Sequence, residues 1–268
     1  VAVTDTSNAA RGTVGCAAPW VCGVGSGAPS MWVRWACSLG GMRCQAGPGT
    51  LAIDAGGTLS GVGSFPAGAT LDLRSANFTL NGATLNGAGL TVLNSSFNGN
   101  KITLVGTTTV NTLLALQADF MGAGNWVLAN TTTWSGGTMA GTGRTTVNVG
   151  VVVTVANGDP TLQRNFTNNG TVSISAARFI NFNNSVATLT NNGTIDLHGD
   201  GAAIDNFNAA AGTLVNNATV VRIVGTGPAT ISVPVTSALA GLQVQAGAGV
   251  VGTGAGCSAR GGASVRSV

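Results

Sequence analysis

A short motif built on two consecutive asparagines recurs three times between residues 165 and 224, and it constrains the fold more than any other feature. Its copies are Phe-Thr-Asn-Asn-Gly-Thr-Val from residue 166, Leu-Thr-Asn-Asn-Gly-Thr-Ile from residue 189 and Leu-Val-Asn-Asn-Ala-Thr-Val from residue 214. The second asparagine of each pair is Asn169, Asn192 or Asn217, so the motif returns after 23 and then 25 residues. Repeats of this length are typical of stacked units, each too thin to bury its own apolar face.

Three short runs of alternating polar and apolar residues lie between the start of the first copy and the second, at 171–175, 178–182 and 186–190. Such alternation is typical of a strand with one buried face. Three strands per repeat, separated by small or Asn-rich corners, predict one coil of a parallel β-helix. We therefore expect an all-β protein, a β-solenoid with about 20–25 residues per coil.

Asn-Gly dipeptides leave an antiparallel sandwich or barrel as the alternative fold, because Asn-Gly often forms a two-residue hairpin turn. Outside the repeated motif they occur at residues 81, 86, 98 and 157. Hairpins, however, would recur about every 8–12 residues. The longer repeat therefore favours parallel coils.

Composition divides the chain into three segments. Residues 1–48 hold four of the five cysteines and three of the five tryptophans, without a clear period. Strand-like alternation begins at Gly49. We predict an N-terminal cap or extension over 1–48, a β-solenoid over 49–240 and a Gly/Ala-rich C-terminal tail over 241–268. A cap is expected because the first coil of a solenoid otherwise exposes apolar side chains and unpaired edges.

The five cysteines indicate an oxidising compartment. Cys16, Cys22, Cys37 and Cys44 are separated by gaps of 6, 15 and 7 residues, which do not supply the closely paired ligands of a zinc site. Two disulfides that staple the N-terminal cap fit better, since disulfides persist in extracellular proteins. Four cysteines allow three pairings, and the sequence does not choose among them. Cys257 is left as a free thiol or an intermolecular link.

The low charge of the chain limits its partners. Charged residues make up 7% of the sequence, the formal net charge is +3, and Lys101 is the sole lysine. Basic charge this dilute, with no basic run, argues against nucleic acid as a partner. No apolar run approaches the roughly 20 residues of a membrane span. The sequence contains no phosphate-binding loop or dinucleotide fingerprint, so we expect no cofactor.

Residues 133–143 read Thr-Trp-Ser-Gly-Gly-Thr-Met-Ala-Gly-Thr-Gly, and the Phe-x-Asn-Asn-Gly-Thr-Val repeats follow them. This combination resembles the β-helical repeat regions of bacterial surface and adhesin-like exoproteins, in the style of autotransporter passengers and filamentous-haemagglutinin-like proteins. The resemblance covers roughly residues 50–230. It implies a right-handed β-helix, exposure outside the cell or at its surface, and a role in attachment or structure. The Cys-rich segment departs from these families, which are usually poor in cysteine.

The paired asparagines have a structural interpretation. At a corner, Asn tolerates left-handed backbone angles and bonds to the backbone, and stacked Asn side chains bond along a column. We therefore expect Asn169, Asn192 and Asn217 to be corner residues of successive coils. Two inward columns are expected beside them, Phe166 with Leu189 and Leu214, and Val172 with Ile195 and Val220. After Val220 the alternation slips, which predicts a bulge at Arg222 or a coil near the end of the stack.

Asp196, His198 and Asp200 form the densest group of ionisable residues. Because they alternate, a strand would place all three on one outward face. There they are weak candidates for acid–base catalysis or a divalent-cation site. A solvated strand edge and turn is the simpler explanation, so we assign no catalytic residue and no metal site.

Threonine runs and glycosylation sequons mark two further kinds of surface. Runs at 107–109, 131–133 and 145–146 suggest an outward Thr array of the kind that some β-solenoid ice-binding proteins use. Their spacings of 24 and about 14 residues do not form a regular column, so ordinary outward strand threonine explains them better. Asn-x-Ser/Thr sequons occur at Asn77, Asn94, Asn130, Asn165, Asn169, Asn183, Asn192 and Asn217.

These observations support one functional hypothesis and two alternatives. The chain is expected to be a non-enzymatic, secreted or cell-surface β-solenoid with a structural or adhesive role. It is expected to associate end to end with copies of itself, because the ends of a stack present unpaired strands and the low charge barely opposes association. Surface glycans are further expected partners. The alternatives are a β-helical polysaccharide lyase or hydrolase that acts through Asp196, His198 and Asp200, and an ice- or glycan-binding solenoid.

Overall fold

The structure is a computed structural model in which the chain forms two compact units, residues 1–130 and 131–268. Short strands between residues 2 and 45 and between residues 248 and 267 are described by their backbone. Side chains are described for residues 49–53, 57–74, 77–94, 101–183, 185–206, 212–237 and 241–247.

The first unit is built from short strands, and all of its described pairings are parallel except the antiparallel pair β1–β2. The bounds are β1 Ala2–Thr4, β2 Thr13–Gly15, β3 Val21–Gly23, β4 Ser30–Val33, β5 Cys37–Leu39, β6 Arg43–Gln45, β7 Gly49–Ile53, β8 Gly57–Ser64, β9 Ala69–Arg74, β10 Phe78–Asn86, β11 Leu90–Asn94, β12 Lys101–Val105, β13 Thr107–Val110, β14 Leu113–Leu116, β15 Asp119–Met121 and β16 Asn125–Leu128.

The long strand β10 forms two sides of a coil by itself. It pairs with β12 through residues 78–81 and with β13 through residues 84–85. Its register against β8 shifts between Asn81 and Ala83, where Gly82 has a positive φ of 62°. An extra residue of this kind bends a strand. β10 therefore bends at Gly82 and continues along the next side of the coil, whereas in later coils two separate strands form these two sides.

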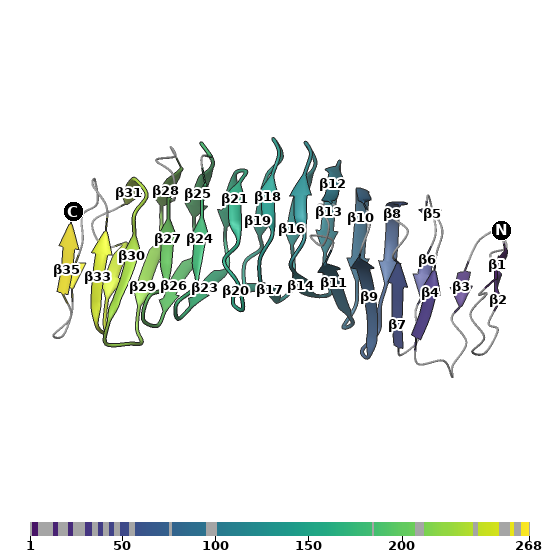
Figure 1. Ribbon diagram of the computed structural model, residues 1–268, viewed down its shortest axis with the longest axis horizontal. Coiled ribbons are helices and arrows are strands. Elements are labelled where there is room, and N and C mark those ends of the chain that lie inside the picture. The colour runs from purple at the N-terminus through teal and green to yellow at the C-terminus, as the bar shows by residue number, and fades with distance from the viewer. Residues whose placement is uncertain are drawn as a thin grey trace. The chain divides into compact units, whose positions relative to one another are not determined.

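The second unit repeats a three-strand coil (Figure 1). Its strands are β17 Thr132–Trp134, β18 Thr138–Ala140, β19 Thr145–Val147, β20 Val152–Val155, β21 Thr161–Gln163, β22 Phe166–Asn168, β23 Thr171–Ser175, β24 Phe179–Asn181, β25 Thr188–Asn191, β26 Thr194–His198, β27 Ala203–Asp205, β28 Thr213–Asn216, β29 Thr219–Arg222, β30 Pro228–Ile231, β31 Val235–Ser237, β32 Leu242–Val244, β33 Ala248–Val251, β34 Ser258–Ala259 and β35 Ser264–Ser267.

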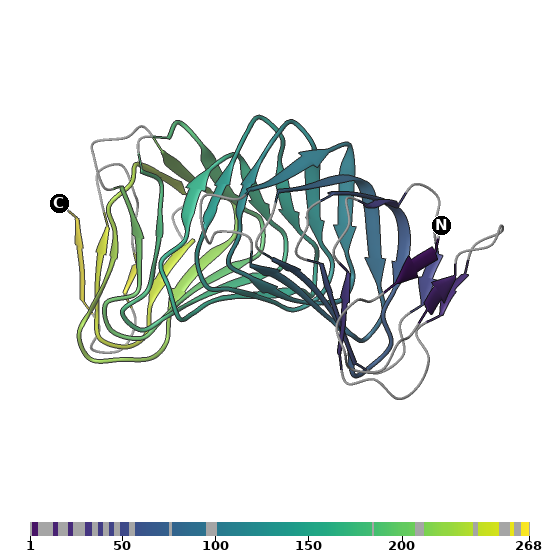
Figure 2. The same ribbon diagram turned by 45° about the vertical axis from the view of Figure 1, so that its right-hand side comes forward.

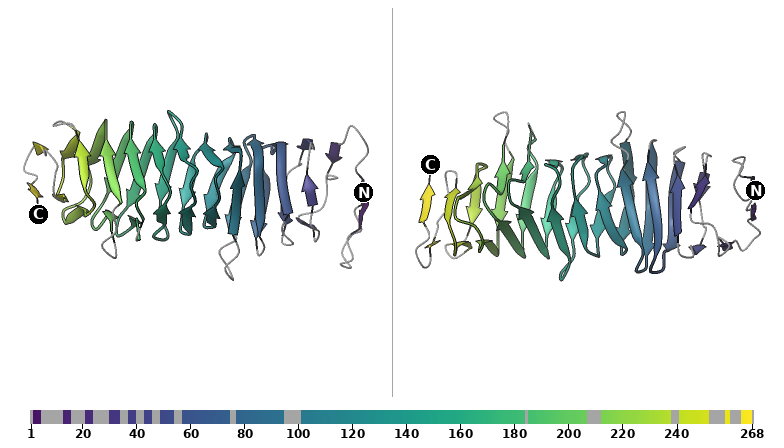
Figure 3. Two further views of the ribbon diagram at one scale, coloured as in Figure 1. Left: turned by 90° about the horizontal axis from the view of Figure 1, so that it is seen from above. Right: turned by 60° about the horizontal axis from the view of Figure 1, so that its bottom comes forward.

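Three parallel walls enclose the core of the second unit. The first wall is β18-β21-β24-β27-β30-β33-β35. The second wall is β19-β22-β25-β28-β31. The third wall is β17-β20-β23-β26-β29-β32-β34. Figure 1 shows β17, β20, β23, β26 and β29 as one row, and Figures 2 and 3 show the same coils from other sides.

The core consists of in-register columns of inward side chains, as the sequence predicts. Phe166 pairs with Leu189 and Leu189 with Leu214, while Val172 pairs with Ile195 and Ile195 with Val220. All six side chains are buried. The predicted parallel β-solenoid is therefore confirmed, and the antiparallel alternative is wrong for every described pairing except β1–β2.

The predicted slip at Arg222 is wrong. β29 keeps its register with β26 through Val221 and its alternation through Arg222. Arg222 therefore points inward and is only 1% exposed. The interior accepts this side chain because corner carbonyl groups and a carboxylate bind its guanidinium, as described below.

Parallel pairing continues on both sides of residues 49–240. β4 pairs with β7, and β33 pairs with β30 and β35. The segment boundaries at 48 and 240 stay predictions. The side chains of the five cysteines lie outside the described residues, so the disulfide staple also stays a prediction. The backbone of β3 and β6 places Cys22 and Cys44 in register.

Replacing Leu189 with Ala tests the core columns. Leu189 is fully buried between Phe166 and Leu214, so the substitution should destabilise the fold by about 2–5 kcal/mol. The neighbouring outward substitution Thr190→Ala is the control and should stay within about 0.5 kcal/mol of the parent chain. Urea unfolding followed by circular dichroism measures both, and equal effects would contradict the inward column.

Candidate functional site

Both asparagines of each repeated pair form a ladder, one inside the coil and one outside. The inner ladder consists of Asn168, Asn191 and Asn216, which are 0%, 0% and 2% exposed. Asn168 Nδ2 donates to Asn191 Oδ1 at 2.8 Å, and Asn191 Nδ2 donates to Asn216 Oδ1 at 2.7 Å. Sequence reasoning assigned the corners to the second asparagine and missed this buried column. Its signal was the alternation, which places the first asparagine on the same side as the apolar residue two positions before it.

Backbone groups complete the hydrogen bonding of the inner ladder. Asn168 Nδ2 also donates to the carbonyl oxygen of Thr194, and Asn168 Oδ1 accepts from Gly170 N at 3.1 Å. Asn216 Nδ2 donates to Ser237 Oγ and to the Gly241 carbonyl oxygen. A buried amide is costly unless its donors and acceptors are satisfied. The ladder meets this requirement by holding the corner backbone of neighbouring coils.

The outer ladder consists of the predicted corner residues Asn169, Asn192 and Asn217. Asn192 Nδ2 donates to Asn169 Oδ1 at 3.0 Å, and Asn217 Nδ2 donates to Asn192 Oδ1 at 2.8 Å. Asn192 and Asn217 are exposed, and Asn169 is half-buried. These three side chains therefore form a continuous polar edge between the second and third walls.

Glycine follows the first two asparagine pairs because the coils approach closely at this corner. A Cβ atom on Gly193 would lie 2.1 Å from the Gly170 carbonyl oxygen, and one on Gly170 would lie 2.3 Å from the Val151 carbonyl oxygen. Backbone atoms cannot move that far without breaking the coil contacts. The close approach thus explains the glycine of the first two copies, and the motif needs no ligand to explain it.

Arg222 and Asp200 form a charged pair at another corner. Arg222 Nη2 donates to Asp200 Oδ1 at 2.7 Å and to the Gly227 carbonyl oxygen at 2.6 Å, and Arg222 Nε donates to the Ala246 carbonyl oxygen. Asp200 Oδ1 also accepts from Gly227 N at 2.9 Å. The Gly227 amide, together with Arg222, lowers the pKa of Asp200. Arg222 therefore contacts three successive coils, and Asp200 is held to the following coil instead of standing free as a catalytic group.

Arg164 is a second buried arginine that sequence reasoning missed. It is 1% exposed, and its Nε donates to the Gly143 carbonyl oxygen at 3.1 Å. Burial lowers its pKa to about 10, so the guanidinium remains charged at neutral pH. Leu162, Arg164 and Phe166 are all inward. Period-2 alternation across the β21–β22 corner was the signal that could have located it.

Asp196 and His198 are hydrogen-bonded to each other, whereas Asp200 lies beyond the end of β26 and bonds to Arg222. His198 Nδ1 lies 2.9 Å from Asp196 Oδ2, and Ser173 Oγ of the preceding coil donates to the same oxygen at 3.5 Å. The His198 side chain is 50% exposed and that of Asp196 is 14% exposed. Asp196 is half-buried, and His198 and Asp200 are exposed, as outward positions require. Only Asp196 and His198 belong to β26, however, because the strand ends before Gly199, which has a φ of 112°.

The chemistry open to this patch is limited to an exposed Asp–His pair. Asp205, the nearest further carboxylate in the sequence, instead accepts hydrogen bonds from Asn206 N and Ser232 Oγ. Within the described residues, no group of three or more His, Cys, Asp or Glu side chains is placed to hold a metal ion. The absence of catalytic residues, metal and cofactor stays a prediction.

The threonine runs do not all point outward. Thr108, Thr132 and Thr145 are buried, which corrects the expectation of outward strand threonine at these positions. Thr108 Oγ1 donates to the Leu80 carbonyl oxygen at 3.4 Å. In each run, alternation turns one threonine into the core.

The sequons differ in exposure. Asn77, Asn165, Asn192 and Asn217 are exposed, whereas Asn94, Asn130, Asn169 and Asn183 are half-buried. Several of these side chains already hold backbone groups, as Asn77 Oδ1 holds Lys101 N at 2.8 Å and Asn165 Oδ1 holds Thr188 N at 3.1 Å. Glycosylation stays a prediction.

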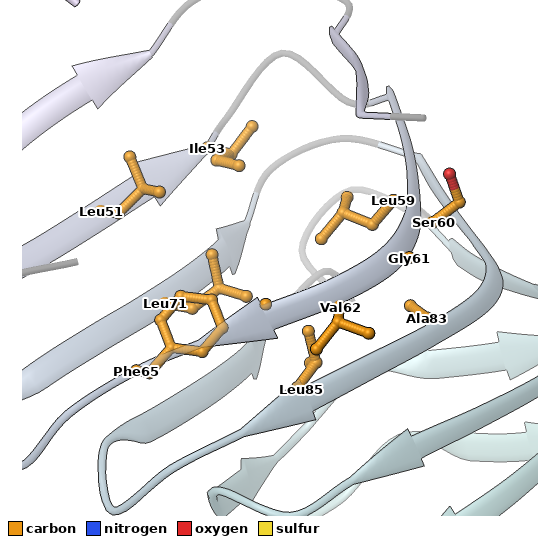
Figure 4. A pocket seen from close by; sticks show the side chains of 11 residues that line it. Leu51, Ile53, Leu59, Ser60, Gly61, Val62, Phe65, Leu71, Ala83 and Leu85 are labelled. Carbon is orange, nitrogen blue, oxygen red and sulfur yellow. The ribbon is translucent and has the colours of Figure 1, made fainter. Parts of the chain in front are cut away.

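A small apolar cavity of about 40 Å³ lies in the first unit, among β7, β8, β9 and β10 (Figure 4). It opens beside Gly61 and Gly63 of β8, which are in register with Ala83 and Leu85. The Phe65 ring fills part of this space, since a Cβ atom on Gly63 would lie 2.8 Å from Phe65 Cε2. Ligand pockets are roughly 300–1,000 Å³, so we interpret the cavity as imperfect packing.

Comparisons of the chain with protein-family models, with curated proteins and with solved structures find no match. The resemblance to adhesin-like repeats therefore stays a prediction. In the part of the chain that the structure describes, no helix has the length and apolar character needed to cross a membrane.

Asn191→Ala should destabilise the fold by about 1–3 kcal/mol, because it leaves buried partners in the coils on both sides without a hydrogen bond. The adjacent variant Asn192→Ala is the matched control, since it removes an exposed ladder residue and should change stability by less than about 0.5 kcal/mol. Urea midpoints measure both effects. A larger loss in the Asn192 variant would refute the division into inner and outer ladders.

Asp200→Asn should lower the thermal midpoint at pH 7, because Arg222 loses its carboxylate partner. Folding lowers the pKa of Asp200, so the ionised group stabilises the fold above its unfolded pKa of about 4 and this contribution is lost as the pH falls. The difference between the parent chain and the variant should therefore shrink below about pH 4. Calorimetry across pH 2–7 measures it, and a constant difference would contradict the assignment.

Proposed function

We propose that this protein is a secreted or cell-surface β-solenoid with a structural and adhesive role, which extends by end-to-end association of identical chains. In this proposal the coils wind right-handedly and disulfides staple the segment 1–48. The observation that carries the proposal is the register of the second and third walls of the second unit, where core, ladders and outward side chains repeat from coil to coil. Such a unit presents a regular surface along its length and an unpaired strand edge at its end.

The parallel strand direction supports association between copies. Among the described strands, β35 is hydrogen-bonded only to β33, and β4 only to β7. An unpaired edge is a ready template for a further strand. Because each coil stacks on the next in the same direction, a second copy joined head to tail preserves parallel pairing. Head-to-tail contacts that do not close into a ring give filaments.

The outward surface supports a structural and adhesive role. Uncharged polar residues predominate on the third wall, where Thr133, Thr154 and Ser173 are in register, and just 7% of the sequence is charged. Low charge weakens the repulsion that would keep copies apart. Interior charges and amides bond to the chain itself, which rigidifies the stack.

Val265→Lys in β35 tests end-to-end association, because a lysine on an edge strand disfavours pairing with another chain. The parent chain should sediment as species that grow with concentration and show filaments by negative stain, whereas the variant should remain monomeric. Val186→Lys is the control, since Val186 is 81% exposed on a corner away from β35 and the same chemical change there should leave association intact. A parent chain that is monomeric at all concentrations would refute association.

A further inference from the structure

Eight outward residues of the second unit form a regular surface that we call the Thr–Asn face. It combines one column on the second wall with the corner column beside it. Its residues are Thr146, Thr167, Thr190 and Val215 in the wall column and Asn148, Asn169, Asn192 and Asn217 in the corner column. Each wall residue is in register with the next. The threonines of this column are half-buried, and the corner asparagines are mostly exposed.

The sequence hides this regularity because the coils differ in length. Thr146 pairs with Thr167 and Thr167 with Thr190, at spacings of 21 and 23 residues. Only Thr146 belongs to one of the threonine runs. Side chains on the face repeat about every 4.8 Å from coil to coil, and the two columns are about 6.6 Å apart along a strand.

The face is uncharged but rich in hydrogen-bonding groups. Thr hydroxyls and Asn amides each donate and accept, and the outer ladder fixes the amides of Asn169, Asn192 and Asn217 in one orientation. Asn192 and Asn217 each use one N–H within the column and Asn169 only accepts there. Further N–H groups and oxygen lone pairs of these amides therefore remain for a ligand. The third wall differs, because its equivalent outward column contains the carboxylate of Asp196.

We propose that the Thr–Asn face binds an extended, neutral polysaccharide. The absence of charge on its eight residues selects against ionic ligands, while hydroxyl-rich sugars match its paired donors and acceptors. Protein partners favour aromatic and large apolar anchors, and Val215 is the one sizeable apolar side chain of the face. The inference rests on the proposed adhesive role, and it does not require end-to-end association.

A linear polymer fits because single contacts on this face are weak. A neutral hydrogen bond contributes only about 0.5–1.5 kcal/mol net. Residues repeated along the stack let one polysaccharide chain make many such contacts at once, and linked sites gain affinity by raising the effective concentration of the next contact. Binding should be strongest on an insoluble polymer surface, and 1 M salt should leave it nearly unchanged because no charge is involved.

Thr190→Lys and Thr194→Lys form a matched pair for the test. Both threonines are half-buried outward residues of the same coil, but Thr190 lies on the Thr–Asn face and Thr194 on the third wall. We expect the full-length chain to bind saturably to at least one of microcrystalline cellulose, chitin and curdlan in a pull-down isotherm. Thr190→Lys should weaken that binding at least tenfold, and Thr194→Lys should change it less than twofold.

A second pair, Thr167→Lys and Thr171→Lys, repeats the test one coil earlier if a variant of the first pair loses its β-sheet circular dichroism signal. No saturable binding to the three polymers, or equal losses in both members of a pair, would overturn the inference. If the parent chain shows thermal hysteresis that Thr190→Lys abolishes, and no polysaccharide binding is found, the face binds ice. That result would also overturn the inference. Sedimentation of the same variants separates the two proposals, because Thr190→Lys should leave association intact.

Discussion

Parallel register between successive coils is the constraint on which the rest of this structure depends. Because each strand pairs in parallel with its counterpart one coil away, every side chain lies over an equivalent side chain. A residue type that tolerates its own kind as a neighbour is therefore favoured at each position. Apolar residues form inward columns, asparagines form ladders at the corner, and threonines form outward columns. One geometric rule thus fixes the core, the corners and the surface.

The interior is notable for the polar groups that it accommodates. Inner-ladder asparagines and two arginines are as buried as the aliphatic side chains around them. Each lies close to a corner, where backbone carbonyl groups point away from the strand ladders and can accept hydrogen bonds. Arg164 and Arg222 bind such carbonyl groups. Polar residues therefore replace backbone hydrogen bonds where the chain turns, and apolar residues and some threonines line the inside of the strands between the turns.

The repeat predicted the fold because the Asn-Asn-Gly corner and the flanking alternation recur at the length of one coil. Predictions failed where the polarity of a residue and the side that strand alternation assigns to it disagreed. A bulge was expected at Arg222 because the alternation slips after Val220, yet the side chain is held inside by Asp200 of the preceding coil and by Gly227 of the following turn. Asp200 was grouped with Asp196 by spacing, whereas it lies past the end of β26 and binds Arg222. The sequence predicted the corner asparagines of the Thr–Asn face but not its wall column, because unequal coil lengths conceal the threonine register that the structure shows.

The two asparagine ladders run in opposite senses. Within the inner ladder each amide donates toward the C-terminal coil, whereas within the outer ladder each amide donates toward the N-terminal coil. Their side-chain dipoles are therefore antiparallel and lie next to each other along the same corner. Neighbouring opposed dipoles attract and largely cancel, so adding coils does not build up a net field along the axis. The corner can lengthen by any number of repeats without an electrostatic penalty that grows with its length.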